Sequence, residues 1–273
     1  MFGSLVIIYP TVHEGGELVF HHGDHEWKFD ANSLTASQSS PSLAYVAFYS
    51  DIEHEVLKVT SGRRVSLTYN LYLMDPTSRV GAPVDEPSFK GVSNLQTTLR
   101  GLLKTPEFLP NGGTLGFGLV HLYPVTFQTK LQEMASYLKG ADALVYQACR
   151  DLQLKPSLQV IYDDNESDQE TGIMLDTIVP TPDYDYKNSS YECTLVEELG
   201  GVPVNKTESA ELEDSIWVAE GESEGEFITW VSPFNRQSRL EDITLAFGNE
   251  PSVGYIYCSP CLIVRIAAAS DRM

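Results

Sequence analysis

Cysteine, basic residues and long hydrophobic runs are all scarce in this 273-residue chain. Four cysteines are too few for a disulfide framework, and no stretch approaches the roughly 20 apolar residues that a membrane helix requires. Only 18 Lys and Arg residues stand against 38 Asp and Glu residues, which gives a formal net charge of −20. Such a surface repels phosphate backbones. The composition therefore excludes nucleic acid as the main partner and predicts no insertion into a membrane.

The amino terminus and one pair of cysteines bear on cellular location. Residues 1–10 are apolar but have neither a basic leader nor a small-residue cleavage site, so we expect a strand there and no signal peptide. Cys258 and Cys261 form a C-x-x-C without a second pair, and we interpret them as two thiols beside a late strand. These features predict an intracellular protein, cytoplasmic or nuclear.

The first 75 residues are rich in β-forming side chains and in turn signals. A Ser-rich loop is predicted at 33–42, and Pro, Gly and Ser are frequent over 76–91, which indicates a linker. Strands are predicted at 5–9, 17–22, 27–30, 43–50 and, as the longest in the chain, 63–74.

The remainder, 92–273, mixes helical and strand patterns and predicts an α+β region. Helices are predicted around 95–103, 127–138 and 141–152. Strands are predicted at 114–122, 157–162, 227–231 and 256–266. The stretch 163–226 is acidic and weakly patterned, so we expect long loops there. Taken whole, the chain is predicted to be mostly β, with an α+β carboxy-terminal region.

The chemically informative segment is 50–72. Alternate residues of a strand share one face, so the polar side chains of this segment are predicted to form a row opposite an apolar row. The members of the polar row are Arg64, Ser66, Thr68 and Asn70. An arginine fork with a nearby hydroxyl is a natural receptor for a carboxylate. His54, one strand earlier, could hold a metal ion beside that carboxylate.

These residues resemble the fungal branch of the iron(II)- and 2-oxoglutarate-dependent oxygenases of the prolyl 4-hydroxylase type. The resemblance covers most of residues 1–75: the Glu-Gly-Gly-Glu-Leu turn at 14–18, Ser-Asp at 50–51, His54, and an Arg-x-Ser at Arg64 and Ser66. It implies a double-stranded β-helix (a jelly-roll or cupin-like fold) in residues 1–75. The segments 138–142 and 248–250 also look like the later half of such proteins.

The same resemblance implies functional roles. His54 corresponds to the distal histidine that binds Fe(II), and Arg64 with Ser66 corresponds to the pair that binds the C5 carboxylate of 2-oxoglutarate. The implied cofactors are Fe(II) and 2-oxoglutarate, with ascorbate as an additional candidate. The implied reaction is hydroxylation of a protein side chain such as proline. The sequence gives no indication of oligomeric state.

One part of the family pattern is absent. The other two iron ligands form a His-x-Asp that precedes the strand corresponding to 5–9, and this chain starts at Met1. Two explanations stay open: a truncated oxygenase, or a non-catalytic interaction protein that keeps the fold. His22 and Asp24 form a local His-x-Asp, which is either a substitute ligand pair or an exposed turn. His121 is expected to lie on a strand and to be structural.

Overall fold

The computed structural model is mostly β and describes residues 1–23, 25–36, 40, 42–72, 90–163, 171–179, 194–206, 225–233, 238–244 and 252–272. The chain divides into two compact units, Met1–Asp85 and Glu86–Met273. The division falls within the predicted linker, 76–91. No helix in the described part of the chain has the length and apolar character needed to cross a membrane.

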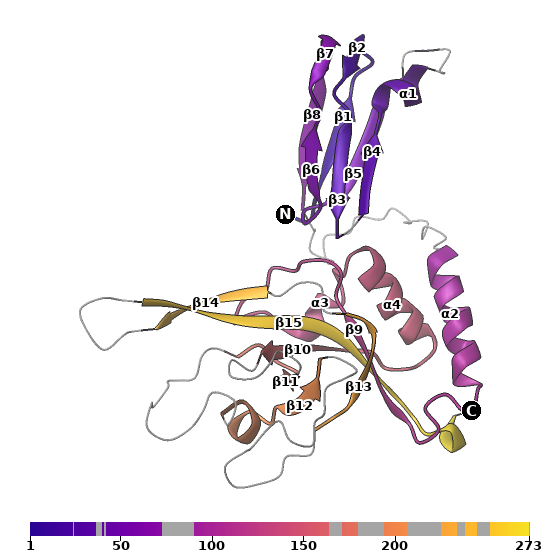
Figure 1. Ribbon diagram of the computed structural model, residues 1–273, viewed down its shortest axis with the longest axis vertical. Helices are drawn as coiled ribbons and strands as arrows, with labels where there is room; N and C mark the ends of the chain where they lie inside the picture. The colour runs from indigo at the N-terminus through magenta and orange to yellow at the C-terminus, as the bar shows by residue number, and fades with distance from the viewer. Residues whose placement is uncertain are drawn as a thin grey trace, which may run out of the picture. The chain divides into compact units, whose positions relative to one another are not determined.

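The first unit consists of short antiparallel strands (Figure 1, indigo to purple). They form a three-stranded sheet of order β5-β1-β8, a second of order β4-β3-β6, and the pair β2-β7. A single helical turn, α1 (Ala31–Ala36), precedes β5. The strands are β1 (Gly3–Ile8), β2 (His13–Gly15), β3 (Leu18–His22), β4 (His25–Phe29), β5 (Ala44–Tyr49), β6 (Glu53–Val56), β7 (Val59–Gly62) and β8 (Ser66–Leu71).

The two three-stranded sheets pack against each other through one apolar cluster. Side chains from β1, β3 and β5 form it, with Val6, Ile8 and Phe20 almost fully buried. The ring of Phe20 stacks on Trp27 at a centroid distance of 5.5 Å and meets Phe48 edge-on at 5.0 Å. The inner face of each sheet is therefore defined by these residues.

Tight backbone contacts hold the end of this unit where β2 pairs with β7. Gly15 and Gly62 have φ values of +75° and +73°, in the left-handed region that favours glycine. A Cβ on Gly62 would lie 2.1 Å from the carbonyl oxygen of Val12, and one on Gly15 would lie 2.3 Å from that of Lys58. No side chain fits at either position.

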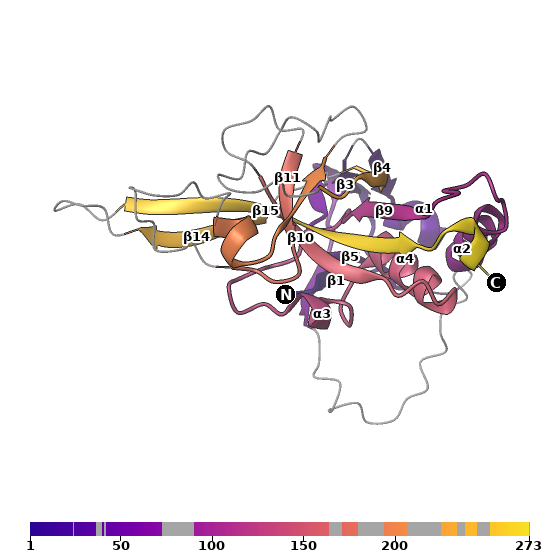
Figure 2. The same cartoon turned by 90° about the horizontal axis from the view of Figure 1, so that it is seen from below.

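The second unit contains a seven-stranded sheet of order β12-β11-β10-β15-β9-β13, with β14 pairing to β15. Figure 2 shows the long strand β15 (yellow) running through this unit. The strands are β9 (Gly113–Gly118), β10 (Ser157–Asp163), β11 (Thr171–Leu175), β12 (Val202–Asn205), β13 (Ile228–Ser232), β14 (Ser238–Thr244) and β15 (Ser252–Ile266). The helices are α2 (Lys90–Leu103), α3 (Leu131–Met134) and α4 (Gly140–Asp151), with short helical turns η2 (Thr194–Glu198) and η3 (Ala269–Asp271).

The helices cover one face of this sheet. The larger apolar cluster joins Leu99 of α2, Met134 of α3 and Cys149 of α4 to side chains of β9, β10, β11 and β15. A separate cluster on the opposite face contains Ile161, Val204 and Ile228, among others, and no residue of a helix.

The two cysteines of the C-x-x-C lie in β15, and both are fully buried. Cys258 belongs to the cluster under the helices, whereas Cys261 belongs to the cluster on the opposite face. Residues three apart on a strand point to opposite sides, so these two thiols cannot share a metal ion or a disulfide. Burial raises the pKa of the Cys261 thiol. The two thiols, predicted to lie beside a late strand, lie within it.

Several predicted elements are confirmed, and others are wrong. The helices predicted around 95–103 and 141–152 correspond to α2 and α4, but the one predicted over 127–138 shrinks to the four residues of α3. The longest strand is β15, and the strand predicted over 63–74 is β8, which starts only at Ser66. Helix α1 (Ala31–Ala36) extends into the loop predicted at 33–42, and the acidic stretch 163–226, predicted to form long loops, contains β11 and β12.

The glycine contacts predict a difference between two substitutions in the first unit. Gly62→Ala should lower the free energy of unfolding by at least about 2 kcal/mol, because it adds a clash with Val12 to the cost of a left-handed alanine. Gly23→Ala is the matched control: its φ is +57° and nothing lies within 4 Å of its Cβ position, so about 1 kcal/mol is expected. Urea denaturation of the full chain measures both. Equal losses would contradict the packing described at Gly62.

Candidate functional site

Arg64 lies in the irregular segment immediately before β8. Its Nη1 donates a hydrogen bond of 3.1 Å to Oγ of Ser66, two residues along the chain. The structure therefore brings together the arginine and the hydroxyl that the sequence predicts to act as a pair.

The rest of the Arg64 guanidinium is shielded from solvent and incompletely paired. Neither Nε nor Nη2 has measurable exposure, and neither has a hydrogen-bond partner in the described part of the chain. Burial lowers the pKa of this guanidinium, but an arginine remains protonated under physiological conditions. Buried donors on a charged group are costly unless they meet an acceptor. An anion placed against Nε and Nη2 would remove that cost.

The Gly-Gly turn at 15–16 makes room for this side chain. A Cβ on Gly16 would lie 2.8 Å from Cδ of Arg64 and 3.0 Å from Cγ2 of Val59, and the backbone there has a φ of +78°. Arg64 therefore passes directly over the bare backbone of Gly16. This contact gives a physical reason for glycine at position 16, in the turn that contributes to the resemblance described above.

A polar row continues from Arg64 along β8. Ser66, Thr68 and Asn70 pair across the sheet with Ile8, Val6 and Ser4 of β1, respectively. Directly paired residues of antiparallel strands share a face, and Ile8 and Val6 belong to the core between the two sheets. The polar row of β8 thus faces the space between the sheets, as the alternation in the sequence predicts.

His54 lies on β6, the strand at one end of the sheet β4-β3-β6. It pairs with Phe20 of β3, so it points to the same inner face, and its ring lies 4.5 Å from that of Phe48. Its Nδ1 is 3.1 Å from the carbonyl oxygen of Ile52, which can only accept a hydrogen bond. The Nδ1 atom therefore carries the proton, and Nε2 is the nitrogen with a lone pair for a metal ion.

Strand β3 relates the two candidate residues to each other. Phe20 pairs with His54, and Gly16, four residues earlier, lies beneath Arg64. Both candidate residues therefore contact positions on the same short stretch of chain, 16–20.

A complete iron site of the expected kind is not formed around His54. In the described residues, no group of three metal-ligating side chains within 4.8 Å of one another includes it. Asp24, half of the local His-x-Asp, lies outside the described residues. The residues present thus fit one ligand of a two-His-one-carboxylate triad and do not supply the other two as they stand.

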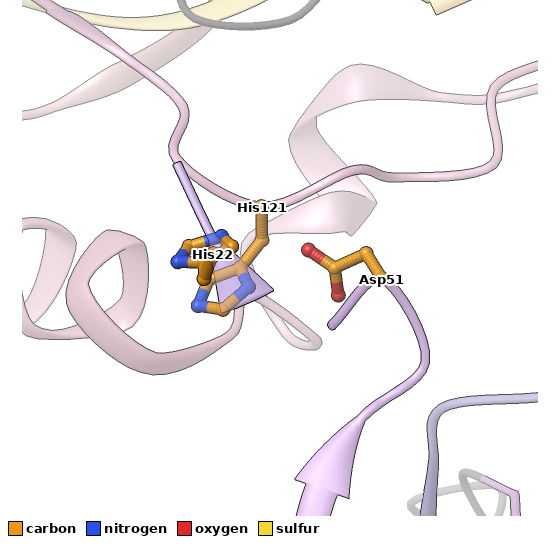
Figure 3. A group of neighbouring side chains, drawn as sticks. All are labelled: His22, Asp51 and His121. Atoms are coloured by element: carbon orange, nitrogen blue, oxygen red, sulfur yellow. The ribbon is translucent and has the colours of Figure 1, made fainter. Parts of the chain in front are cut away.

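A different acidic residue lies beside His22. The ligand atoms of His22 and Asp51 lie within 4.8 Å of each other, and both side chains are half-buried (Figure 3). The third side chain drawn in Figure 3, His121, belongs to the second unit, whose position relative to the first is not determined, and it is not counted as a ligand here. The sequence paired His22 with Asp24 and missed Asp51, because 29 residues separate the two along the chain.

Comparisons with known proteins add no identification. No protein-family model, no curated protein and no solved structure matches this chain.

The second unit contains a buried polar network that the sequence did not reveal. Asp142, at the start of α4, accepts hydrogen bonds from the backbone N–H groups of Val120 and His121 and from the hydroxyl of Tyr123. Lys139 donates through Nζ to the carbonyl oxygen of Leu122. The network fastens the segment after β9 to the first turn of α4. His121 is buried, as expected of a structural residue, but it lies after β9 and not on a strand.

This network predicts a large effect of one isosteric substitution. Asp142→Asn should lower the free energy of unfolding by about 2–3 kcal/mol, because an amide nitrogen would face buried donors that need an acceptor. Asp151→Asn, on the exposed end of the same helix, is the control and should cost less than about 1 kcal/mol. Urea denaturation compares the two. A loss at Asp142 no greater than at Asp151 would show that the network is unimportant for stability.

Proposed function

We propose that residues 1–75 form a jelly roll of the kind found in iron(II)- and 2-oxoglutarate-dependent oxygenases, and that Arg64 and Ser66 bind the C5 carboxylate of 2-oxoglutarate. The observation that carries the proposal is the Arg64 guanidinium, whose Nη1 is paired with Ser66 while Nε and Nη2 are buried without an acceptor. A carboxylate has two oxygens in the geometry that matches two such donors.

The strand order supports the fold assignment. Going along the chain, β5 joins the first sheet, β6 the second and β8 the first again. The earlier strands β1 and β3 lie in the middle of their sheets, each between two later strands. Two packed antiparallel sheets between which the later strands β5, β6 and β8 are distributed in turn are compatible with a jelly roll.

The choice of ligand rests on the contacts that Arg64 and His54 make with residues 16–20. A five-carbon dicarboxylate has a carboxylate at each end, so we propose that one end contacts Arg64 and the other a metal ion on His54. Thr68 and Asn70, on the inner face of β8, offer further hydrogen bonds along the way. A monocarboxylate would satisfy Arg64 but leave the rest of this polar row unused.

In the complete reaction, bound iron would activate O₂ and couple decarboxylation of the 2-oxo acid to hydroxylation of a substrate, for which we propose a protein side chain such as proline. The residues of this chain have narrower tasks. Arg64 and Ser66 would hold and neutralise the far carboxylate, Gly16 leaves room for the Arg64 side chain, and His54 would present Nε2. Ascorbate would serve only to keep such an iron reduced.

A second function is favoured by the shortage of ligands around His54. A protein that keeps the fold and the anion site, but not the family's iron triad, would bind 2-oxoglutarate or a related dicarboxylate without oxidising anything. Binding of the dicarboxylate is common to both functions. The two differ in turnover, which a succinate-release assay with added Fe(II) distinguishes.

Binding of 2-oxoglutarate to the metal-free chain tests the proposal. Isothermal titration calorimetry in the presence of EDTA should show saturable binding of about one molecule per chain. Arg64→Ala should weaken it by about 30-fold or more, because a buried charged donor pair is lost, and Ser66→Ala by about fivefold. Gly16→Ala should also weaken it, since the new methyl group displaces Cδ of Arg64.

Arg63→Ala is the matched control, because Arg63 is an exposed neighbour of the same charge. Its affinity for 2-oxoglutarate should remain within about twofold of the unsubstituted chain. Absence of binding at millimolar 2-oxoglutarate, or an equal loss in Arg63→Ala and Arg64→Ala, would refute the proposed anion site.

A further inference from the structure

The outer face of the sheet β5-β1-β8 is apolar. Val6 and Ile8 of β1 belong to the core between the two sheets, so the alternate residues Leu5 and Ile7 point outward. The directly paired residues of β5 and β8 share this outer face and complete two rows across the three strands. The first row is Tyr45, Ile7 and Leu67, and the second is Ala47, Leu5 and Tyr69. These six residues define the apolar face, and none of them carries a charge.

The large side chains of the apolar face are exposed. Tyr45 is 70% exposed, Tyr69 49% and Leu67 43%. The pairing of β1 with β8 continues past the end of β1, where the backbone N–H of Tyr9 donates to the carbonyl oxygen of Val65, and both of these side chains are exposed as well. Single exposed hydrophobic residues are ordinary, but a contiguous apolar patch marks a surface that binds another.

The outer face of the other sheet, β4-β3-β6, has the opposite character. His21 of β3 is paired there with Glu26 of β4 and with Glu53 of β6. Lys28 and Glu55 follow two residues further along the same two strands. Charged side chains of this kind are well solvated. Exposed apolar residues are therefore concentrated on one outer face of the unit and are not a general property of its surface.

We propose that the apolar face binds the same face of a second copy of this chain, which forms a two-fold symmetric dimer. The proposal goes beyond 2-oxoglutarate binding, since the residues proposed to bind that ligand do not belong to the apolar face. The two inferences can therefore fail separately.

The arrangement of large and small side chains favours a second copy as the partner. A two-fold axis that crosses the three strands between the two rows places each row opposite the other row of the second copy. Tyr45 then lies over Ala47, the smallest side chain of the face, and Tyr9 lies over Gly3, which has no side chain. On β8, the leucine and the tyrosine of the two rows lie over each other. The strands of the two sheets stay aligned, as they do in packed β-sandwiches.

The size and charge of the apolar face agree with weak self-association. Each large aromatic side chain can bury about 150–250 Å². Two copies of the face would cover roughly 1,000–1,200 Å² in total, which is at the lower end for specific interfaces. Each chain has a formal net charge of −20, so two copies repel each other except where their surfaces are uncharged. The apolar face is a surface that a second copy can approach without bringing like charges into contact.

Sedimentation velocity of the full 273-residue chain tests the dimer. A concentration series from about 1 to 200 µM should show a monomer–dimer equilibrium with its midpoint in this range. Raising NaCl from about 50 to 500 mM should strengthen the dimer by at least about threefold, because salt screens the repulsion between the two acidic chains.

One pair of variants separates the apolar face from exposed leucines in general. Leu67→Glu should weaken the dimer by at least about tenfold, because it places an unpaired carboxylate in the interface. Leu199→Glu is the matched control: this leucine of the second unit is 42% exposed, and its substitution should change the affinity by less than about twofold. Ala47→Arg, which fills the space proposed for Tyr45 without removing a contact, should weaken the dimer as Leu67→Glu does.

A mixture of two charged variants tests the two-fold arrangement itself. In that arrangement, Leu67 of one copy faces Tyr69 of the other. Leu67→Glu mixed with Tyr69→Lys should therefore form a heterodimer in which an introduced carboxylate meets an introduced ammonium group. The heterodimer should be at least about tenfold tighter than the self-association of either variant alone. Circular dichroism establishes that each variant is folded.

Three results would overturn the proposal. The first is an unsubstituted chain that stays monomeric at about 200 µM, which would leave the apolar face to a partner other than a second copy. The second is a loss of affinity in Leu67→Glu and Ala47→Arg no greater than in Leu199→Glu. The third is a mixture of Leu67→Glu with Tyr69→Lys that associates no more tightly than either variant alone.

Discussion

A charged guanidinium that is shielded from water needs acceptors, and this requirement organises the first unit of the molecule. Arg64 meets it only in part through Ser66, while Nε and Nη2 are left without a partner among the described residues. Two features surround the Arg64 side chain. The backbone of Gly16, which has no side chain, lies beneath it, and the polar row of β8 continues from it along the inner face of the sheet. A carboxylate is the acceptor that we propose for these two donors.

The two sheets of the first unit present their candidate residues on facing surfaces. Strand β8 carries the polar row in one sheet, and β6 carries His54 in the other, with both rows facing the space between. The apolar cluster around Phe20 fixes the separation of the sheets. We propose that a carboxylate bound at Arg64 lies in the space between these two faces.

Much of the first unit could be predicted from the sequence, because its signals are local. The Arg64–Ser66 contact follows from i, i+2 alternation, and the inward polar row follows from the same rule. The pairing of His22 with Asp51 could not be predicted, since it depends on how β3 and the β5–β6 turn meet in space. The start of β8 was also misplaced: the pattern extends the strand to 63, whereas the backbone at Arg64 is irregular.

In the second unit, periodicity located α2 and α4, but long-range contacts decided the rest. The acidic stretch after β10 still forms β11 and β12, because antiparallel pairing satisfies their backbones and buries Ile173 and Val204. Nothing in the sequence indicates that the carboxylate of Asp142 accepts three hydrogen bonds from the segment after β9. The composition of a segment shows that it is polar, but it does not show which of its polar groups form hydrogen bonds with each other.

The most direct test of the account is the Nε–H resonance of Arg64 in a ¹⁵N NMR spectrum of the chain, assigned by its absence in Arg64→Lys. The account predicts that 2-oxoglutarate shifts this signal in a saturable manner and slows its exchange with water, while the signal of Arg63 stays unchanged. A signal of Arg64 that does not respond at saturating 2-oxoglutarate would contradict the claim that its buried guanidinium is the receptor for a carboxylate.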